Sequence, residues 1–131
     1  MTDPVVQNVR AFRFDVFKGV ADSTGKIHRL RSAGYASQIE GHTTYAICLN
    51  AFLRDRFFLL PEDKKRSDAD FVMFTREPSR NPKRKYSWYR VGEARFLPGE
   101  NSELLQLQWD VFGVADIFMT LTPRPDEGAK A

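Results

Sequence analysis

The clearest signal of secondary structure in this chain is the sequence ELLQLQWDV at residues 103–111. Leu105, Leu107 and Trp109 alternate with polar glutamines over this stretch. A period of two is typical of a β-strand that buries one face, because successive side chains point to opposite sides of a sheet. The same alternation recurs in residues 12–16, 44–51 and 117–122, so the sequence predicts an all-β fold.

From these alternating stretches and the turns between them, we expect eight mainly antiparallel strands that form a small barrel or sandwich. Turn-forming residues separate the apolar runs, for example ADSTG at 21–25 and PGEN at 98–101. Residues 49–60 also show apolar side chains at helical spacing, so a helix there is the alternative. The expected strands lie near residues 11–18, 26–37, 43–53, 56–61, 70–76, 85–96, 103–111 and 117–122.

The strands fall into two diverged four-strand repeats, at about residues 11–61 and 70–123. Gly34 aligns with Gly92 at an offset of 58, and the alternating strand at 45–52 aligns with 105–112 at an offset of 60. Chance similarity between two all-β halves is the alternative. Because one half of about 55 residues buries little surface alone, we expect both halves to share one core in a single domain, residues 1–131. Residues 124–131 are expected to be a disordered tail.

The second half also carries a resemblance. Its YRVGEA at 89–94, the pattern LxLxW at 105–109 and IxMxLxP at 117–123 resemble small bacterial β proteins of unknown function, encoded near plasmid or mobile-element genes. The resemblance covers residues 70–123 and implies a small β fold in that genetic setting. It implies no catalytic residues.

Composition narrows the class of protein. The chain of 131 residues has one cysteine, so it has no internal disulfide, and it has no apolar run long enough for a membrane span. We therefore expect a cytoplasmic protein without a membrane partner. The net charge of +3 is uneven, because residues 76–90 carry six cations and one carboxylate. Such a segment suits a polyanionic partner.

Catalytic chemistry finds little support. His28 and His42 have no partner at metal-ligand spacing, and a free cysteine such as Cys48 is usually inert when it is buried. Glu93 is one carboxylate worth following, although pairing with Arg95 explains it as well. The sequence therefore predicts a non-enzymatic binding protein with no catalytic residue, metal site or cofactor.

A basic and aromatic strand predicts one binding surface. Cations that follow phosphates and aromatic rings that stack on bases are typical of proteins that bind single-stranded DNA or RNA. A solvated hairpin tip, with Trp88 in the core, is the alternative. The nucleic-acid-binding residues predicted on this strand are Lys83, Arg84, Lys85, Tyr86, Trp88 and Arg90, and those on the corresponding strand of the first repeat are Lys26, Arg29 and Arg31.

A dense apolar stretch supports a different and favoured hypothesis, in which the protein acts through contacts with a protein partner or as a homodimer. In residues 57–60, FFLL, neighbouring side chains face opposite ways, so one set is exposed unless it is covered. Burial of both sets inside a closed structure is the alternative. The predicted interface residues are Phe52, Phe57, Phe58 and Leu60.

Overall fold

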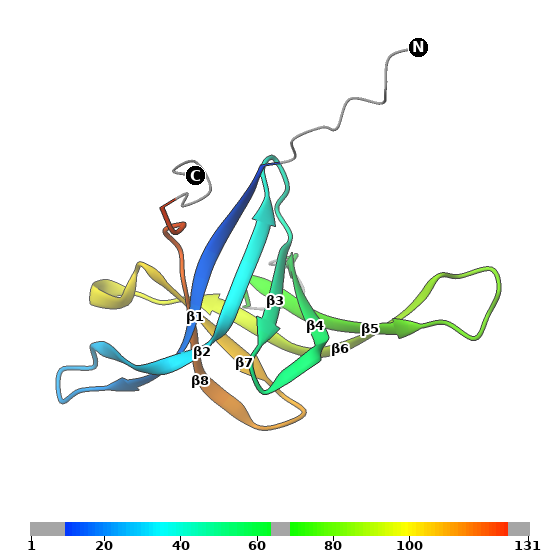
Figure 1. Cartoon of the computed structure of the whole chain (residues 1–131). Helices are drawn as coiled ribbons and strands as arrows, with labels where there is room; N and C mark the ends of the chain where they lie inside the picture. Colours follow the sequence, from blue (N-terminus) through cyan, green and yellow to red (C-terminus); the bar gives the residue numbers. More distant parts are fainter. Residues whose placement is uncertain (1–9, 64–68, 126–131) are drawn as a thin grey trace, which may run out of the picture.

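The computed structural model describes residues 10–63 and 69–125 and shows a closed barrel of eight antiparallel strands in chain order (Figure 1). Each strand pairs with the next one along the chain, and β8 pairs with β1. A single turn of 3-10 helix, Gly99–Asn101, precedes β7. The strands are β1 (Ala11–Ala21), β2 (Ile27–Ile39), β3 (Tyr45–Leu49), β4 (Phe52–Pro61), β5 (Phe71–Pro78), β6 (Tyr86–Phe96), β7 (Leu104–Trp109) and β8 (Val114–Thr120). The all-β prediction is confirmed, and the architecture is a barrel rather than a sandwich.

A bulge in β1 lies at the pairing with β8 that closes the barrel. Val16 and Phe17 are adjacent and both buried, because the register of β1 on β2 shifts between them. Val16 therefore faces the interior, whereas Phe17 packs beside Phe118 of β8 with ring centroids 6.0 Å apart. Across the bulge, residues Val16, Phe17 and Lys18 pair with residues 117–119 of β8, which closes the sheet. Bulges commonly increase the local twist of a strand.

The interior is filled by alternating side chains, as the period of two predicts. Eight strands enclose a space that side chains can fill. In this barrel the largest fully buried side chains are Val16, Ile47, Leu59, Met73, Leu105, Leu107, Trp109 and Met119. Among the described side chains, the indole Nε1 of Trp109 is the one buried nitrogen or oxygen atom without a hydrogen-bond partner.

Two glycines permit close approach of neighbouring strands. Gly34 of β2 lies opposite Leu49, and Gly92 of β6 lies opposite Trp109. A Cβ atom at Gly34 would lie 2.0 Å from the carbonyl oxygen of Cys48, so any other side chain is excluded without movement of the backbone. The two positions are those aligned in the predicted repeat, but similar geometry in two β halves does not establish common descent, and the repeat stays a prediction.

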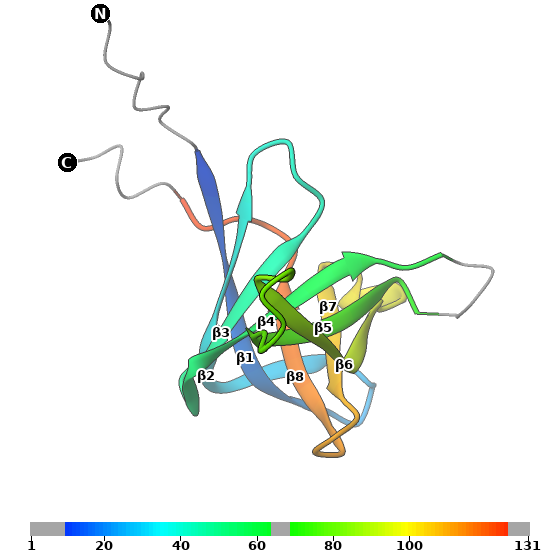
Figure 2. The same ribbon diagram turned by 90° about the vertical axis from the view of Figure 1, so that its right-hand side faces the viewer.

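Two long hairpins project from the barrel on opposite sides. The β1–β2 hairpin extends to the left and the β5–β6 hairpin to the right in Figure 1, and the quarter turn in Figure 2 brings the β5–β6 hairpin toward the viewer. The side chain of Asn101 fastens the base of the β1–β2 hairpin, because its Oδ1 accepts a hydrogen bond from the amide of Ile27 at 2.9 Å. The turns β3–β4 and β7–β8 are both at the lower end of the barrel in the two views, and Phe52 and Phe112 connect them through stacked rings.

Two expectations require correction. The helix over residues 49–60 is wrong, and the strand expected at 43–53 ends at Leu49, because Asn50 and Ala51 form the turn into β4. The expected disorder does not begin at Arg124, whose amide donates to the carbonyl oxygen of Arg13 at 2.7 Å and whose side chain pairs with Asp15. Residues 126–131 of that expected tail lie outside the described residues.

Candidate nucleic-acid interface

The tip of the β5–β6 hairpin has a shape fixed by its own polar groups. The amide of Ser79 donates to the carbonyl oxygen of Lys85 at 3.1 Å, and the amide of Arg84 donates to that of Asn81 at 3.0 Å. The side-chain oxygen of Asn81 accepts from the amide of Lys83, also at 3.0 Å. Asn side chains commonly support turns in this way. The cations of the tip therefore project from an ordered turn.

An aromatic cluster covers one face of the hairpin. The ring of Trp88 contacts Phe58 of β4 edge to face at 5.3 Å and Tyr86 at 6.5 Å. The guanidinium of Arg76 lies over all three rings, at 4.0 Å from the centroid of Tyr86, 4.8 Å from Phe58 and 5.4 Å from Trp88. Trp88 is nevertheless 49% exposed. The aromatic cluster is therefore partly exposed although a cation lies against its rings. A planar partner can reach its exposed part.

The opposite face of the hairpin is a polar hollow of about 590 Å³. Arg80 and Arg84 contribute positive charge to its lining. The hydroxyl of Tyr89 donates to Glu77 Oε1 at 2.9 Å across the same hollow. This hydrogen bond and the negative charge of Glu77 raise the pKa of Tyr89, so the phenol stays a neutral donor. The hollow therefore combines two guanidinium groups with a neutral phenol and the one carboxylate to which it is bonded, and its lining carries a net positive charge.

The cations of the tip differ in their charge environment from Arg90 at the base of the hairpin. Within the described residues, Arg80, Lys83, Arg84 and Lys85 make no ion pair. Arg90, by contrast, contacts Asp110 at 3.1 Å and Glu93 at 3.8 Å. The available positive charge is thus concentrated at the tip, and Arg90, a predicted site residue, is already neutralised.

The second predicted basic strand lies elsewhere. Lys26, Arg29 and Arg31 belong to the β1–β2 hairpin or its turn, on the side of the barrel opposite the β5–β6 hairpin (Figure 1). Arg29 pairs with Asp15 at 3.5 Å and lies over the ring of Phe17. The structure therefore does not join the two basic strands into one surface.

The four predicted interface residues do not form one surface either. Phe57 lies inside the barrel and is 4% exposed. Phe58 and Leu60 face outward on β4, where Phe58 belongs to the aromatic cluster. Phe52 lies at the lower end of the barrel, stacked on Phe112 with centroids 5.4 Å apart. The placement of Phe57 and Phe58 agrees with the expected alternation along this stretch.

Sequence reasoning missed Arg76 as a site residue. It is the cation that joins the aromatic cluster, because it lies directly opposite Trp88 in the β5–β6 register. The breaker residues 78–82 predict a hairpin, but a turn centred on them would pair position 76 with position 84, whereas the hairpin of the structure is centred on Pro82 and pairs 76 with 88. The sequence alone did not specify which cation would face the rings.

Other kinds of site find no support in the part of the chain that the structure describes. Residues 10–63 and 69–125 contain no group of three metal-ligating side chains, and no helix there is long and apolar enough to cross a membrane. The fold and the hairpin define the class as an antiparallel up-and-down β-barrel that carries a projecting cationic and aromatic hairpin. No protein-family model, curated protein or solved structure matches the chain, so the resemblance over residues 70–123 is unsupported.

Proposed function

We propose that the protein binds single-stranded nucleic acid through the β5–β6 hairpin. The observation that carries this proposal is the exposed Trp88, in contact with Tyr86 and Arg76 on a hairpin whose tip presents four cations without ion pairs among the described residues. Protein contacts were the favoured hypothesis from the sequence. The dispersal of the predicted interface residues makes that function the second choice.

The two faces of the hairpin suit the two parts of a nucleotide. Bases would stack on Trp88 and Tyr86, at about 1–3 kcal/mol for each base. Phosphates would lie along the tip, near Arg80 and Arg84 in the polar hollow. Four phosphate contacts predict a slope of about −3 for the logarithm of the binding constant against the logarithm of salt concentration. Duplexes should bind less well, because their bases are not available for stacking.

Fluorescence anisotropy with a labelled 15-nucleotide oligothymidylate at low salt tests the proposal. We expect Trp88→Ala to weaken binding about tenfold, and replacement of Lys83, Arg84 and Lys85 by Gln to weaken it and to flatten the salt dependence. Arg54→Gln, which removes an exposed charge on β4, is the control and should change binding little.

Two results would overturn the proposal. One is the absence of any anisotropy change with ample protein at low salt. The other is equal binding by the Trp88→Ala variant and the Arg54→Gln control. A stoichiometric polypeptide that co-purifies with the protein, in the absence of nuclease-sensitive material, would instead favour the protein-contact hypothesis.

A further inference from the structure

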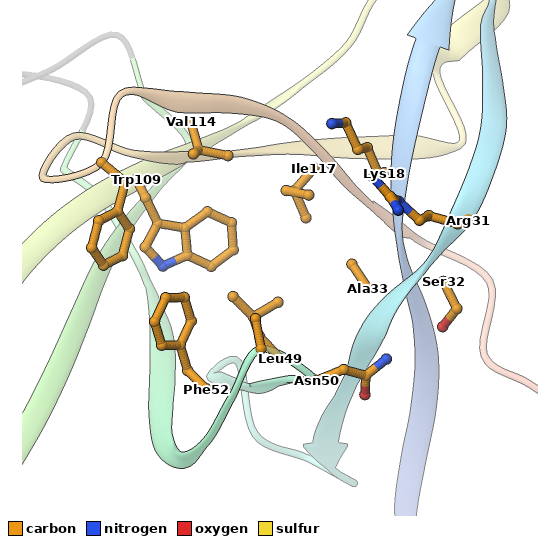
Figure 3. A pocket seen from close by; sticks show the side chains of 12 residues that line it. Lys18, Arg31, Ser32, Ala33, Leu49, Asn50, Phe52, Trp109, Val114 and Ile117 are labelled. Atoms are coloured by element: carbon orange, nitrogen blue, oxygen red, sulfur yellow. The ribbon is translucent and has the colours of Figure 1, made fainter.

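The lower end of the barrel contains a second candidate site, a pocket of about 280 Å³ that is separate from the β5–β6 hairpin (Figure 3). Its walls come from the end of the barrel interior and from the turns β3–β4 and β7–β8. Most of its lining is apolar. The apolar lining residues that the following steps use are Leu49, Phe52, Trp109, Phe112, Val114 and Ile117.

A stacked aromatic pair lines the outer part of the pocket. Phe52 and Phe112 come from different turns, and their rings are parallel within 3°. Both rings remain partly exposed, so the pocket reaches the surface beside them. A cavity of about 150 Å³ accommodates one benzene ring, so a volume of about 280 Å³ suits a medium-length chain or a bicyclic ring.

Two cations lie together on one wall of this apolar pocket. Lys18 of β1 and Arg31 of β2 are directly opposite each other in the strand register, and both line the pocket. Figure 3 shows them on the side of the pocket opposite Trp109. Like charges at such positions repel each other. Within the described residues, Lys18 contacts Asp116 at 3.6 Å, whereas Arg31 makes no ion pair. One positive charge is therefore unbalanced, which suits a single anionic group.

Trp109 forms the wall opposite these two cations and can report on the interior of the pocket. The residue is 1% exposed and lines the pocket, and its Nε1 has no acceptor among the described residues. A buried donor without an acceptor is unfavourable. Because an anionic group would lie at Lys18 and Arg31, on the far side, the acceptor for this indole would be a water that enters with the occupant.

We propose that this pocket binds a small carboxylate with an apolar body, either a medium-chain or an aryl acid. The apolar body lies among Leu49, Val114 and Ile117, and the carboxylate contacts Arg31 and Lys18. The site shares no residue with the β5–β6 hairpin, so the two proposals can fail independently; Arg31, which the sequence predicted for nucleic acid, lines this pocket instead.

Octanoate and 1-octanol are the matched probes, because they share the alkyl body and differ in charge. Two-dimensional NMR of the indole N–H groups follows binding, and the Trp88→Phe variant assigns the remaining signal to Trp109. We expect octanoate to shift the Trp109 signal in a saturable manner. Octanol should bind at least about tenfold more weakly, since hydrogen bonds to charged groups contribute strongly.

Arg31→Gln separates the charge from the cavity. This exposed substitution should weaken octanoate binding about tenfold or more and leave octanol binding unchanged. Arg56→Gln on β4, which does not line the pocket, is the matched control. Ala33→Phe should abolish binding of both probes by filling the space, and an unchanged far-UV spectrum would verify that this variant folds.

Three outcomes would overturn the proposal. The first is a Trp109 signal that does not respond to millimolar octanoate, and the second is equal binding of octanoate and octanol. The third is a shift of the signal with protein concentration and without a probe, together with a rise in mass in sedimentation. That last result would identify a second copy of the chain as the occupant.

Discussion

Replacing Gly92 by Ala should destabilise the barrel strongly, although it adds one methyl group. A Cβ atom at this position would lie 1.9 Å from the carbonyl oxygen of Gln108 and 3.1 Å from the Cα of Trp109. The first contact involves backbone, so β6 and β7 must separate until it exceeds about 3.0 Å. That movement also strains the adjacent hydrogen bond from the amide of Asp110 to the carbonyl oxygen of Val91, now 2.9 Å.

The expected loss of unfolding free energy in Gly92→Ala follows from these two effects. Overpacking a well-packed site costs about 1–3 kcal/mol, and weakening one backbone hydrogen bond adds about 1 kcal/mol. We therefore expect the free energy of unfolding to fall by about 2–4 kcal/mol, a large part of the stability of a domain of this size. Urea unfolding, followed by far-UV circular dichroism, measures it.

A matched glycine separates crowding from backbone conformation. Gly25, in the β1–β2 turn, has a φ of +89°, but a Cβ there would meet nothing within 4 Å. Gly25→Ala should therefore cost about 1–2 kcal/mol from conformation alone. If Gly92→Ala proved no more destabilising than Gly25→Ala, the inferred steric conflict between β6 and β7 would be refuted.

Three further predictions concern the core, the lower end and the β1–β2 turn. Leu59→Ala should lower the free energy of unfolding by about 2–5 kcal/mol because Leu59 is fully buried. The control Leu53→Ala, at a position 82% exposed, should change it by less than about 0.5 kcal/mol. Equal effects of the two substitutions would contradict the assigned core. A double-mutant cycle of Phe52→Ala and Phe112→Ala should give a coupling of about 0.5–1.5 kcal/mol for the stacked rings, and a value near zero would contradict the stack. Hydrogen bonds, first from the side chain of Thr24, hold the pKa of Asp22 well below its ordinary value of 3.8. The ionised form therefore stabilises the turn above about pH 4, and this contribution should be lost as the pH falls further; a carboxyl titration by NMR with a midpoint near 4 would disagree.

The class of fold could be predicted because the period of two is kept over long stretches such as β7, although a bulge interrupts it in β1 and three successive residues are buried in β5. Leu105, Leu107 and Trp109 are all buried, as their alternation indicates. Val111 continues the same pattern in the sequence but is exposed. The alternating pattern predicts on which side of the sheet a side chain lies for as long as the strand continues. It does not indicate where the strand ends, which here is at the turn that begins at Asp110.

Closure into a barrel and the composition of the candidate sites could not be derived in this way. Closure depends on pairs such as Val16 with Met119, which are 103 positions apart and lie beside a bulge after Val16 that the sequence does not signal. The grouping of Arg76 with Trp88 required the register of β5 on β6. The pocket was missed altogether, because Lys18 and Arg31 come from one hairpin and Trp109 from the opposite half of the sequence.

The pairing of β1 with β8, the seam that closes the barrel, indicates which strand pair should form last in folding and separate first in unfolding. Every other strand pair joins neighbours along the chain, so those hairpins can form early, whereas the seam must wait for the whole barrel. Lys18 and Ile117 are paired across that seam, and both also line the pocket at the lower end. A molecule bound there would therefore stabilise the strand pair that forms last. We expect it to slow amide hydrogen exchange more in β1 and β8 than in any other strand.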